Sequence, residues 1–328
     1  MSENNQSMMQ LLHRQCASGP ISYRDYIATV LYAKGCGYYQ RATARVGRSA
    51  DHDFYTSESL GRVFSQLVVG ASESLLGTDI TIKSSFIEIA AEPGRSLLDQ
   101  LGAHPFASSK VIRLGEPVEA TGQAIIFANE WLDALPFHRL VFRNGQWRER
   151  GVLFESGKLA EVLLENPSAV VAKVIRKLST DIEEGYQLDL PLEAENALKE
   201  LITQDWTGLI LLFDYGKTTE ALLQDCPNGT ARSYYRHEQG NDLLERPGEQ
   251  DITCDINWTP LVNRLKSTGF TSITLESQES FLVKRAASAA EAIVTASAGS
   301  FSTDRQTLME LIHPANMGQR FQVLWGMR

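Results

Sequence analysis

The chain of 328 residues lacks any apolar run of the ~18 residues that a membrane-spanning helix needs. It also lacks an excess of basic residues: 40 acidic and 31 basic side chains give a net charge of −9. A nucleic-acid partner would require a basic surface to neutralise its phosphates. We therefore expect neither nucleic acid nor a membrane as a partner. Hydrophobic residues at 43% describe an ordinary soluble protein with enough apolar side chains for a core.

Cysteine is scarce, and the four that occur form no Cys-x-x-Cys pair and no zinc-ligand spacing: Cys16, Cys36, Cys226 and Cys254. Such scattered thiols argue against a disulfide framework and against a bound metal. The amino terminus has neither an apolar secretory core nor an Arg-rich presequence. We expect a cytoplasmic protein with reduced thiols.

Two common catalytic signatures are also missing. No Gly-x-Ser-x-Gly sequence indicates a hydrolase. No Gly-x-Gly-x-x-Gly follows the first apolar strand, which makes a dehydrogenase a poor interpretation. His138 and His237 are the histidines near polar motifs, and a lone histidine is more often structural than catalytic.

What the chain does contain is a series of apolar runs of strand length that alternate with helical patterns. The predicted strands are 86–90, 110–114, 124–127, 208–216, 272–275 and 321–325. This alternation predicts an α/β fold, with a mainly parallel sheet covered by helices on both faces. Helices are expected over 8–34, from about 59 to 76, after Gly94, and over 257–267.

We expect two parts: an N-terminal helical extension over 1–84, and an α/β domain over 85–328 with an insertion at about 138–205. Ser22 can cap a helix in the extension. In the insertion, Asn144-Gly145 and Ser156-Gly157 are typical hairpin turns. Residues 165–205 are acidic and are expected to be helical.

The most informative polar residues follow the strand at 124–127. In open α/β sheets, ligands bind beyond the carboxyl ends of the strands, and this segment places Asn129, Glu130 and Asp133 there. If a helical turn begins at this point, the three-residue gap puts both carboxylates on one side. The alternative is a simple helix start, where the helix dipole favours acids.

Several segments together resemble one known family. They are Asn-Glu-Trp-Leu-Asp-Ala-Leu-Pro at 129–136, Asp-Tyr-Gly at 214–216, Pro-Gly-Glu-Gln-Asp-Ile-Thr-Cys-Asp at 247–255, and Gly-Cys-Gly-Tyr-Tyr at 35–39. They are similar to the methyltransferase-like family of the mitochondrial complex I assembly factor, also called MidA. The resemblance implies a class I, Rossmann-like fold that binds S-adenosyl-L-methionine. The mitochondrial member methylates an arginine of a complex I subunit, and this chain resembles a compact bacterial relative.

The resemblance also implies roles for individual residues. Asn129, Glu130, Asp133 and Asp214 would be catalytic, and Asp251, Thr253 and Asp255 would lie on the substrate side. The cofactor would be bound by Asp53, Thr56, Glu58, Glu88, Ala90, Gly94 and Asn129. For residues 53–58, a helix cap is an equally good interpretation. The implied partner is a protein, either a substrate or an assembly partner.

The cofactor loop departs from the family pattern Glu-x-Gly-x-Gly-x-Gly. Here Ala90 replaces the first glycine and Glu92 the second, and Gly94 remains. Alanine is a mild change if its φ is negative, whereas Glu92 would bring bulk and charge close to the cofactor. The passage from 95 to 128 also has room for only one strand, and Glu116 after it would either bind a ribose or belong to a turn.

Two hypotheses follow. In the first, the protein is a methyltransferase that acts on a protein nitrogen such as that of arginine. In the second, it is a catalytically degenerate protein of the same fold that serves as a binding or assembly factor.

Overall fold

The structure, a computed structural model, describes residues 3–40, 61–296 and 302–328. The chain divides into two compact units, each assembled from three segments. Unit 1 comprises Met1–Thr43, Leu132–Asn196 and Lys217–Thr259; unit 2 comprises Ala44–Trp131, Ala197–Gly216 and Pro260–Arg328. Each unit has its own sheet and its own apolar core.

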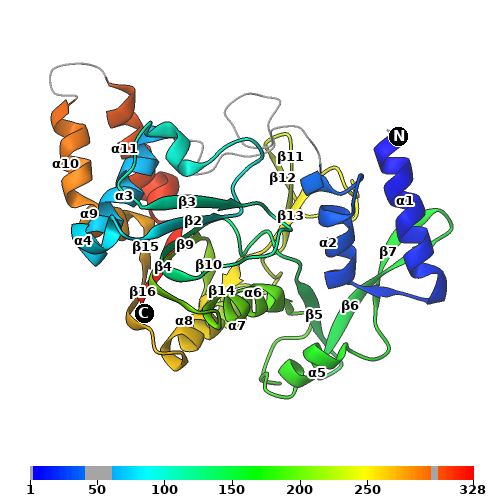
Figure 1. Ribbon diagram of the computed structural model, residues 1–328. Helices are drawn as coiled ribbons and strands as arrows, with labels where there is room; N and C mark the ends of the chain where they lie inside the picture. Colours follow the sequence, from blue (N-terminus) through cyan, green and yellow to red (C-terminus); the bar gives the residue numbers. More distant parts are fainter. Residues whose placement is uncertain (1–2, 41–60, 297–301) are drawn as a thin grey trace. The chain divides into compact units, whose positions relative to one another are not determined.

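Unit 2 contains a six-stranded sheet in the order β15-β16-β9-β4-β2-β3 (Figure 1). Strands β3, β2, β4 and β9 are parallel, whereas β16 runs antiparallel to both β9 and β15. Their bounds are Ser85–Ile89 (β2), Ser108–Ile112 (β3), Gly122–Asn129 (β4), Trp206–Asp214 (β9), Thr271–Ser277 (β15) and Gln322–Met327 (β16). The predicted mainly parallel α/β sheet is confirmed.

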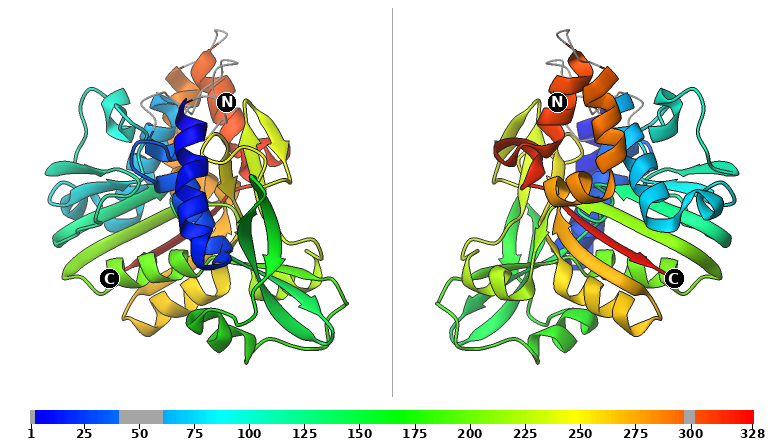
Figure 2. Two further views of the ribbon diagram at one scale, coloured as in Figure 1. Left: turned by 90° about the vertical axis from the view of Figure 1, so that its right-hand side faces the viewer. Right: turned by 90° about the vertical axis from the view of Figure 1, so that its left-hand side faces the viewer.

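Helices cover this sheet on both faces, which explains why β4 and β9 are continuous apolar runs (Figure 2). On one face, Phe64 of α3 and Phe281 of α9 each lie with ring centroids 5.4 Å from Phe213 of β9. The helices of that face are α3 (Arg62–Leu76), α9 (Gln278–Arg285), α10 (Ala287–Ala296) and α11 (Thr303–Ile312), with α4 (Thr78–Thr81) and the short turns η4 (Leu97–Gln100) and η5 (Pro314–Gly318). On the opposite face lie α8 (Trp258–Ser267) and the C-terminal part of α6 (Leu192–Ile202).

Two expected helices differ from the structure. After Gly94 there is only η4, a four-residue 3-10 turn, because just 18 residues separate β2 from β3 and Pro93, Gly102 and Pro105 interrupt them. The stretch 165–205 is not continuously helical: β8 (Gln187–Leu190) lies between α5 (Ala169–Ile175) and α6. The acidic composition of this stretch favoured a helical interpretation, so β8 was not predicted.

Unit 1 is built on a five-stranded sheet in which β1 (Ile21–Ser22), β6 (Gln146–Glu155), β5 (His138–Arg143) and β8 follow one another and β7 (Lys158–Leu163) pairs with β6. The two predicted hairpin turns are confirmed: Asn144 and Ser156 have φ 55°, each before a glycine with positive φ. A core of nine buried side chains fills this unit: Leu140, Phe142, Trp147, Val171, Tyr186, Leu188, Leu190, Leu222 and Cys226.

The remaining elements of unit 1 include two N-terminal helices and a small second sheet. As predicted, Ser22 caps α2 by accepting a hydrogen bond from the Asp25 N–H. The second sheet has the order β12-β11-β13. The bounds are α1 (Glu3–Gln15), η1 (Cys16–Ser18), α2 (Tyr23–Tyr32), η2 (Tyr38–Gln40), β10 (Gly216–Lys217), α7 (Thr219–Gln224), β11 (Arg232–Tyr235), β12 (Glu238–Gly240), β13 (Asp251–Thr253) and β14 (Ile256–Asn257).

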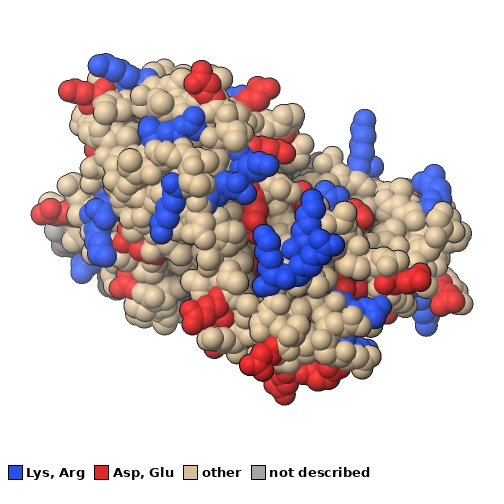
Figure 3. All heavy atoms as spheres, turned by 90° about the horizontal axis from the view of Figure 1, so that it is seen from below, with Lys and Arg blue, Asp and Glu red and all other residues tan. Residues whose placement is uncertain are grey.

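The surface carries charges of both signs. On the face drawn in Figure 3, acidic and basic side chains are interspersed. None of the helices in the described ranges combines the length and the apolar composition needed to cross a bilayer.

Candidate functional site

The carboxyl ends of three adjacent strands form the first candidate region, in unit 2. Strand β4 pairs with β2 on one side and with β9 on the other, with Ala128 opposite Ile89 and Asn129 opposite Phe213. The residues that follow these strands therefore lie next to one another at one edge of the sheet. The structure thus brings together three predicted site residues, Ala90, Asn129 and Asp214.

Asn129 is the most telling of these residues. Its side chain is 8% exposed, and its Nδ2 donates to Glu130 Oε1 at 3.0 Å. Its Oδ1 is buried and has no hydrogen-bond partner within the described part of the chain. A buried acceptor without a donor costs about 1–3 kcal/mol, so this oxygen indicates a place where a ligand donor would bind.

Asp214, at the end of β9, is fully enclosed at 1% exposure. Its Oδ1 accepts the Tyr215 N–H at 2.9 Å, and the Gly216 N–H that follows donates to Gln322 of β16 at 3.0 Å. These bonds fix the turn that leaves β9. Its catalytic role stays a prediction.

The loop after β2 has a backbone that the sequence pattern did not predict. Ala90, in place of the first family glycine, has φ 68°, and Gly94 has φ 72°. The left-handed region is strained for alanine, so this replacement is not the mild change expected for a negative φ. The loop therefore needs contacts that hold it.

Glu88 provides one of these contacts. It is 2% exposed, and both of its carboxylate oxygens accept the Leu97 N–H, at 3.0 and 2.9 Å. Burial raises the pKa of Glu88, and the hydrogen bonds from Leu97 and Ser96 and the charge of Arg113 oppose that shift. Glu88 thus shapes the far end of the loop, and its predicted contact with the cofactor stays a prediction.

Arg113, which the sequence gave no reason to select, supplies the other contact. Its Nη1 donates to the carbonyl oxygens of Glu92 and Arg95. Glu116, considered for a ribose contact, accepts the Arg113 N–H at 2.7 Å and closes a turn, as its Gly-Glu-Pro context indicated.

Glu130 and Asp133 are not placed by a helical turn. Strand β4 continues to Asn129, Glu130 has φ 50°, and the Leu135 N–H bonds to the Leu132 carbonyl in a turn. The conditional expectation of one helical face is therefore wrong. The left-handed backbone conformation of Glu130 interrupts regular secondary structure after β4. Pro136 disfavours a helical conformation at the residue before it. Glu130 belongs to unit 2 and Asp133 to unit 1.

In unit 1, predicted residues from distant parts of the chain do meet. Thr253 Oγ1 donates to Asp133 Oδ2 at 3.0 Å, across 120 positions. Asp251 Oδ1 accepts the Tyr39 phenol at 2.8 Å and the Ile252 N–H at 3.0 Å. Both carboxylates are 6% exposed. Buried carboxylates held by neutral donors keep their geometry and can orient a cation.

Tyr39 was not predicted as a site residue, although it lies in the Gly-Tyr-Tyr turn. Burial raises the pKa of its phenol well above the usual value, and Asp251, Tyr32 and Asp133 add to that shift. The turn requires Gly37, because a Cβ there would lie 2.6–2.9 Å from backbone atoms of Leu31 and Ala33. Gly37, as a marker of a fixed turn next to Tyr39, was the feature of the sequence that could have identified this tyrosine.

Asp255 lies among cations in unit 1. Its carboxylate bonds to Arg232 at 2.8 Å and to Lys217 at 3.3 Å, along the wall of a polar hollow of about 900 Å³. Its charge is thus matched by protein groups. Asp53, Thr56 and Glu58 lie outside the described residues.

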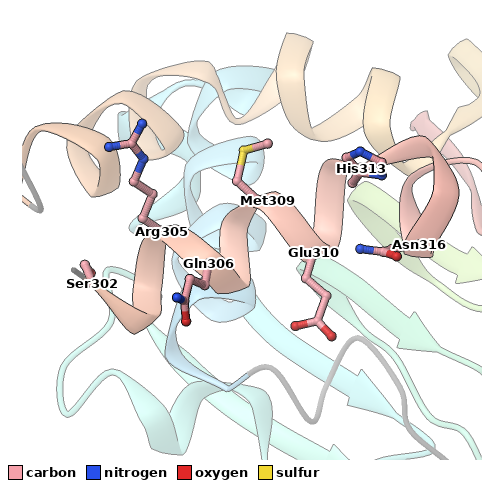
Figure 4. A pocket seen from close by; sticks show the side chains of 7 residues that line it. All are labelled: Ser302, Arg305, Gln306, Met309, Glu310, His313 and Asn316. Atoms are coloured by element: carbon pink, nitrogen blue, oxygen red, sulfur yellow. The ribbon is translucent and has the colours of Figure 1, made fainter.

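A separate hollow of about 570 Å³ runs along α11 and the turn after it (Figure 4). The described residues that line it include none of the predicted site residues: Ser302, Arg305, Gln306, Met309, Glu310, His313 and Asn316. Across the described residues, no group of three or more His, Cys, Asp or Glu side chains could hold a metal ion.

Comparison with known proteins identifies the fold and the family. A family model described as "Putative S-adenosyl-L-methionine-dependent methyltransferase" matches residues 95–275, more than half of the chain. A protein from Burkholderia thailandensis, crystallised with S-adenosyl-homocysteine, superimposes with a TM-score of 0.85 at 23% identity, covering 99% of this chain and 92% of that one. This likeness confirms the fold.

Curated relatives extend over nearly the whole chain. The zebrafish "Protein arginine methyltransferase NDUFAF7, mitochondrial" is 26% identical over 97% of this chain and 86% of its own length. The mouse protein of the same name is 24% identical over 97% and 84%. The MidA-type resemblance is confirmed, and with the family model matching most of the chain, this protein belongs to the S-adenosyl-L-methionine-dependent methyltransferases.

Proposed function

We propose that this methyltransferase acts on a nitrogen of a protein side chain, with the guanidinium of arginine as the leading candidate. The supporting observation is the pair of buried carboxylates in unit 1, Asp133 and Asp251, each held by an uncharged donor. Carboxylates grip a guanidinium through charge-assisted, often bidentate hydrogen bonds. The names of the zebrafish and mouse relatives agree with this substrate class.

The residues at the strand ends of unit 2 suit the cofactor. The buried Oδ1 of Asn129 needs a donor, and S-adenosyl-L-methionine carries an ammonium group and ribose hydroxyls that can donate. The loop 90–94 would border the methionine part of the cofactor, with Gly94 as its remaining family glycine. We assign Asn129, Ala90 and Gly94 to cofactor binding, together with Asp53, Thr56 and Glu58 from the sequence pattern.

Bound S-adenosyl-L-methionine supplies an electrophilic methyl group on a sulfonium. The protein must then hold the acceptor nitrogen in line with that methyl group. When the nitrogen takes the methyl group, leaving S-adenosyl-homocysteine, the proton of the nitrogen would pass to a neighbouring carboxylate or to water. We assign this orientation to Glu130 and Asp133, with Asp214 as a support at the end of β9. Thr253 would hold the Asp133 carboxylate in place, and Asp251 and Asp255 would complete the acceptor side.

The test uses the variants Glu130→Gln and Asp133→Asn. Loss of one member of a charge-assisted pair costs about 1.5–3 kcal/mol, so methyl transfer should slow roughly ten- to a hundred-fold. Transfer of a labelled methyl group to proteins in a lysate from a deletion strain would be measured, with hydrolysis to identify the methylated residue. Melting temperature and S-adenosyl-homocysteine affinity are the controls.

Three outcomes would contradict the proposal. Wild-type rates in both variants would show that Glu130 and Asp133 only form part of a turn and do not take part in methyl transfer. Label on oxygen or carbon would exclude a nitrogen acceptor. A wild-type protein that binds S-adenosyl-homocysteine and captures a partner, yet transfers nothing, would favour the assembly factor instead.

A further inference from the structure

The loop that joins β2 to η4 is hydrogen-bonded to two charged side chains, Glu88 and Arg113. Glu88, inside β2, binds the Leu97 N–H at the far end of the loop. Arg113, directly after β3, binds the carbonyl oxygens of Glu92 and Arg95 in its middle. Glu88 lies in β2 and Arg113 directly follows the neighbouring parallel strand β3, so the sheet fixes the starting points of both side chains.

The position of Arg113 follows from strand pairing. Strands β2 and β3 pair up to Ile89 and Ile112, and the Ala90 N–H still donates to the Ile112 carbonyl at 2.8 Å. Arg113 is the next residue, so its side chain starts beside the loop. The loop itself turns at 92–95, where the Arg95 N–H donates to the Glu92 carbonyl at 3.2 Å. The guanidinium of Arg113 therefore joins both carbonyls of one turn.

The loop has a reason to need such a brace. A loop with glycine at each close-approach position takes a positive φ without steric cost, whereas Ala90 has φ 68°. A strained conformation persists only where surrounding contacts over-determine it. Arg113 and Glu88 both hydrogen-bond to the backbone of this loop, and Ser65 Oγ adds a bond to the Leu97 carbonyl at 2.5 Å.

We propose that Arg113 is a positioning residue for S-adenosyl-L-methionine: it holds the 92–95 turn in the conformation that admits the cofactor, in place of the missing glycines. It acts through the carbonyls of Glu92 and Arg95 and makes no contact with the reacting atoms. The backbone that carries the Glu92 side chain is held by the same contact. Cofactor affinity thus depends on a residue of the neighbouring strand.

The test compares Arg113→Ala, Arg113→Lys and the control Lys110→Ala by calorimetric titration of S-adenosyl-homocysteine. Lys110 lies in β3, three residues before Arg113. It is exposed and pairs with the exposed Glu119 at 3.5 Å, so its removal changes the same charge without touching the loop. Arg113→Ala should weaken binding roughly ten-fold, the effect of losing a charge-assisted bond. Arg113→Lys can still reach one carbonyl and should fall between wild type and Arg113→Ala.

A purely structural role predicts a different pattern. It would lower the melting temperature of the ligand-free Arg113→Ala protein and leave the affinity of the folded fraction unchanged. Affinity within two-fold of wild type in Arg113→Ala, or equal losses in Arg113→Ala and Lys110→Ala, would overturn the proposal. So would wild-type protein that fails to bind S-adenosyl-homocysteine. Arg113→Lys keeps the test decisive if the alanine variant does not fold.

Discussion

Removing a single oxygen from Tyr39 is expected to weaken the binding of a cationic acceptor. The Tyr39 phenol and the Ile252 N–H both donate to Asp251 Oδ1, at 2.8 and 3.0 Å, and two donors on one oxygen fix the carboxylate plane. In Tyr39→Phe the phenol donor is lost, while the Ile252 N–H donor remains. The ring itself is retained by its neighbours Tyr32 and Tyr38, whose centroids each lie 5.2 Å away.

The size of the effect follows from the charge and burial of the acceptor. A hydrogen bond to a carboxylate contributes about 1.5–3 kcal/mol, and Asp251 is 6% exposed, so little water can replace the phenol. If half of that energy is needed to keep the carboxylate oriented, cation affinity falls by about 1 kcal/mol, roughly five-fold. The raised pKa of Tyr39 keeps the phenol protonated at neutral pH, so the loss should not vary between about pH 6 and 8.

The assay is a titration with methylguanidinium, and with N-methylurea as its uncharged near-isostere, in the presence of S-adenosyl-homocysteine. Tyr26→Phe is the matched control, because it also loses a buried phenol, one that donates to the Leu243 carbonyl at 2.8 Å. Only Tyr39→Phe should lose methylguanidinium affinity, and neither variant should change the response to N-methylurea. Equal behaviour of the two variants, or a loss that includes the neutral probe, would refute the reasoning.

Two further predictions concern stability. Burial raises the pKa of Glu88 in the folded state above its ordinary value of 4.5, so the folded state holds the proton more tightly than the unfolded state. The free energy of unfolding should therefore fall as pH rises from about 4.5 through the folded pKa. Glu88→Gln should flatten this dependence in denaturation curves taken from about pH 4 to 8, and an unchanged slope would contradict the prediction. Asp189, 3% exposed, accepts the N–H groups of Thr230 and Ala231 at 2.6 and 2.8 Å and the Arg139 guanidinium at 2.8 Å. Asp189→Ala would remove the nearer carboxylate of the buried Arg139, which keeps a longer ion pair to Glu161 at 3.7 Å. It should cost about 3 kcal/mol in urea unfolding, whereas a loss under about 1 kcal/mol would show that water replaces the carboxylate.

The strands of unit 2 were predictable because burial on both faces makes a parallel strand apolar throughout, as in 208–214. The hairpin turns were predictable because Asn-Gly and Ser-Gly tolerate positive φ. Strand β8 was not, because Gln187 and Asp189 interrupt its apolar pattern and Asp189 is buried by its partners. A sequence window cannot show that an aspartate will be satisfied by residues forty positions away.

The sequence allowed several residues of the candidate site to be selected, but it did not show how they are arranged in space. Asp133 and Thr253 were both selected, yet their bond joins residues 120 positions apart and depends on the fold of unit 1. Arg113 was missed because its function depends on backbone carbonyls, which have no signature in the sequence. The positive φ of Ala90 was missed for a similar reason, since alanine gives no sign of a left-handed conformation.

Strand β16 comes last in sequence among the strands of the six-stranded sheet, yet it lies inside it, between β9 and β15. During synthesis, more than a hundred residues are therefore added after β9 before β16, its second neighbour in the sheet, has been made. Over that interval an apolar strand has an open edge, the kind of surface that recruits other chains. Such late, long-range pairing also slows folding. We expect the nascent chain to depend on chaperones at this stage, and mutations in β16 to affect the yield of folded protein more than the stability of molecules that have already folded.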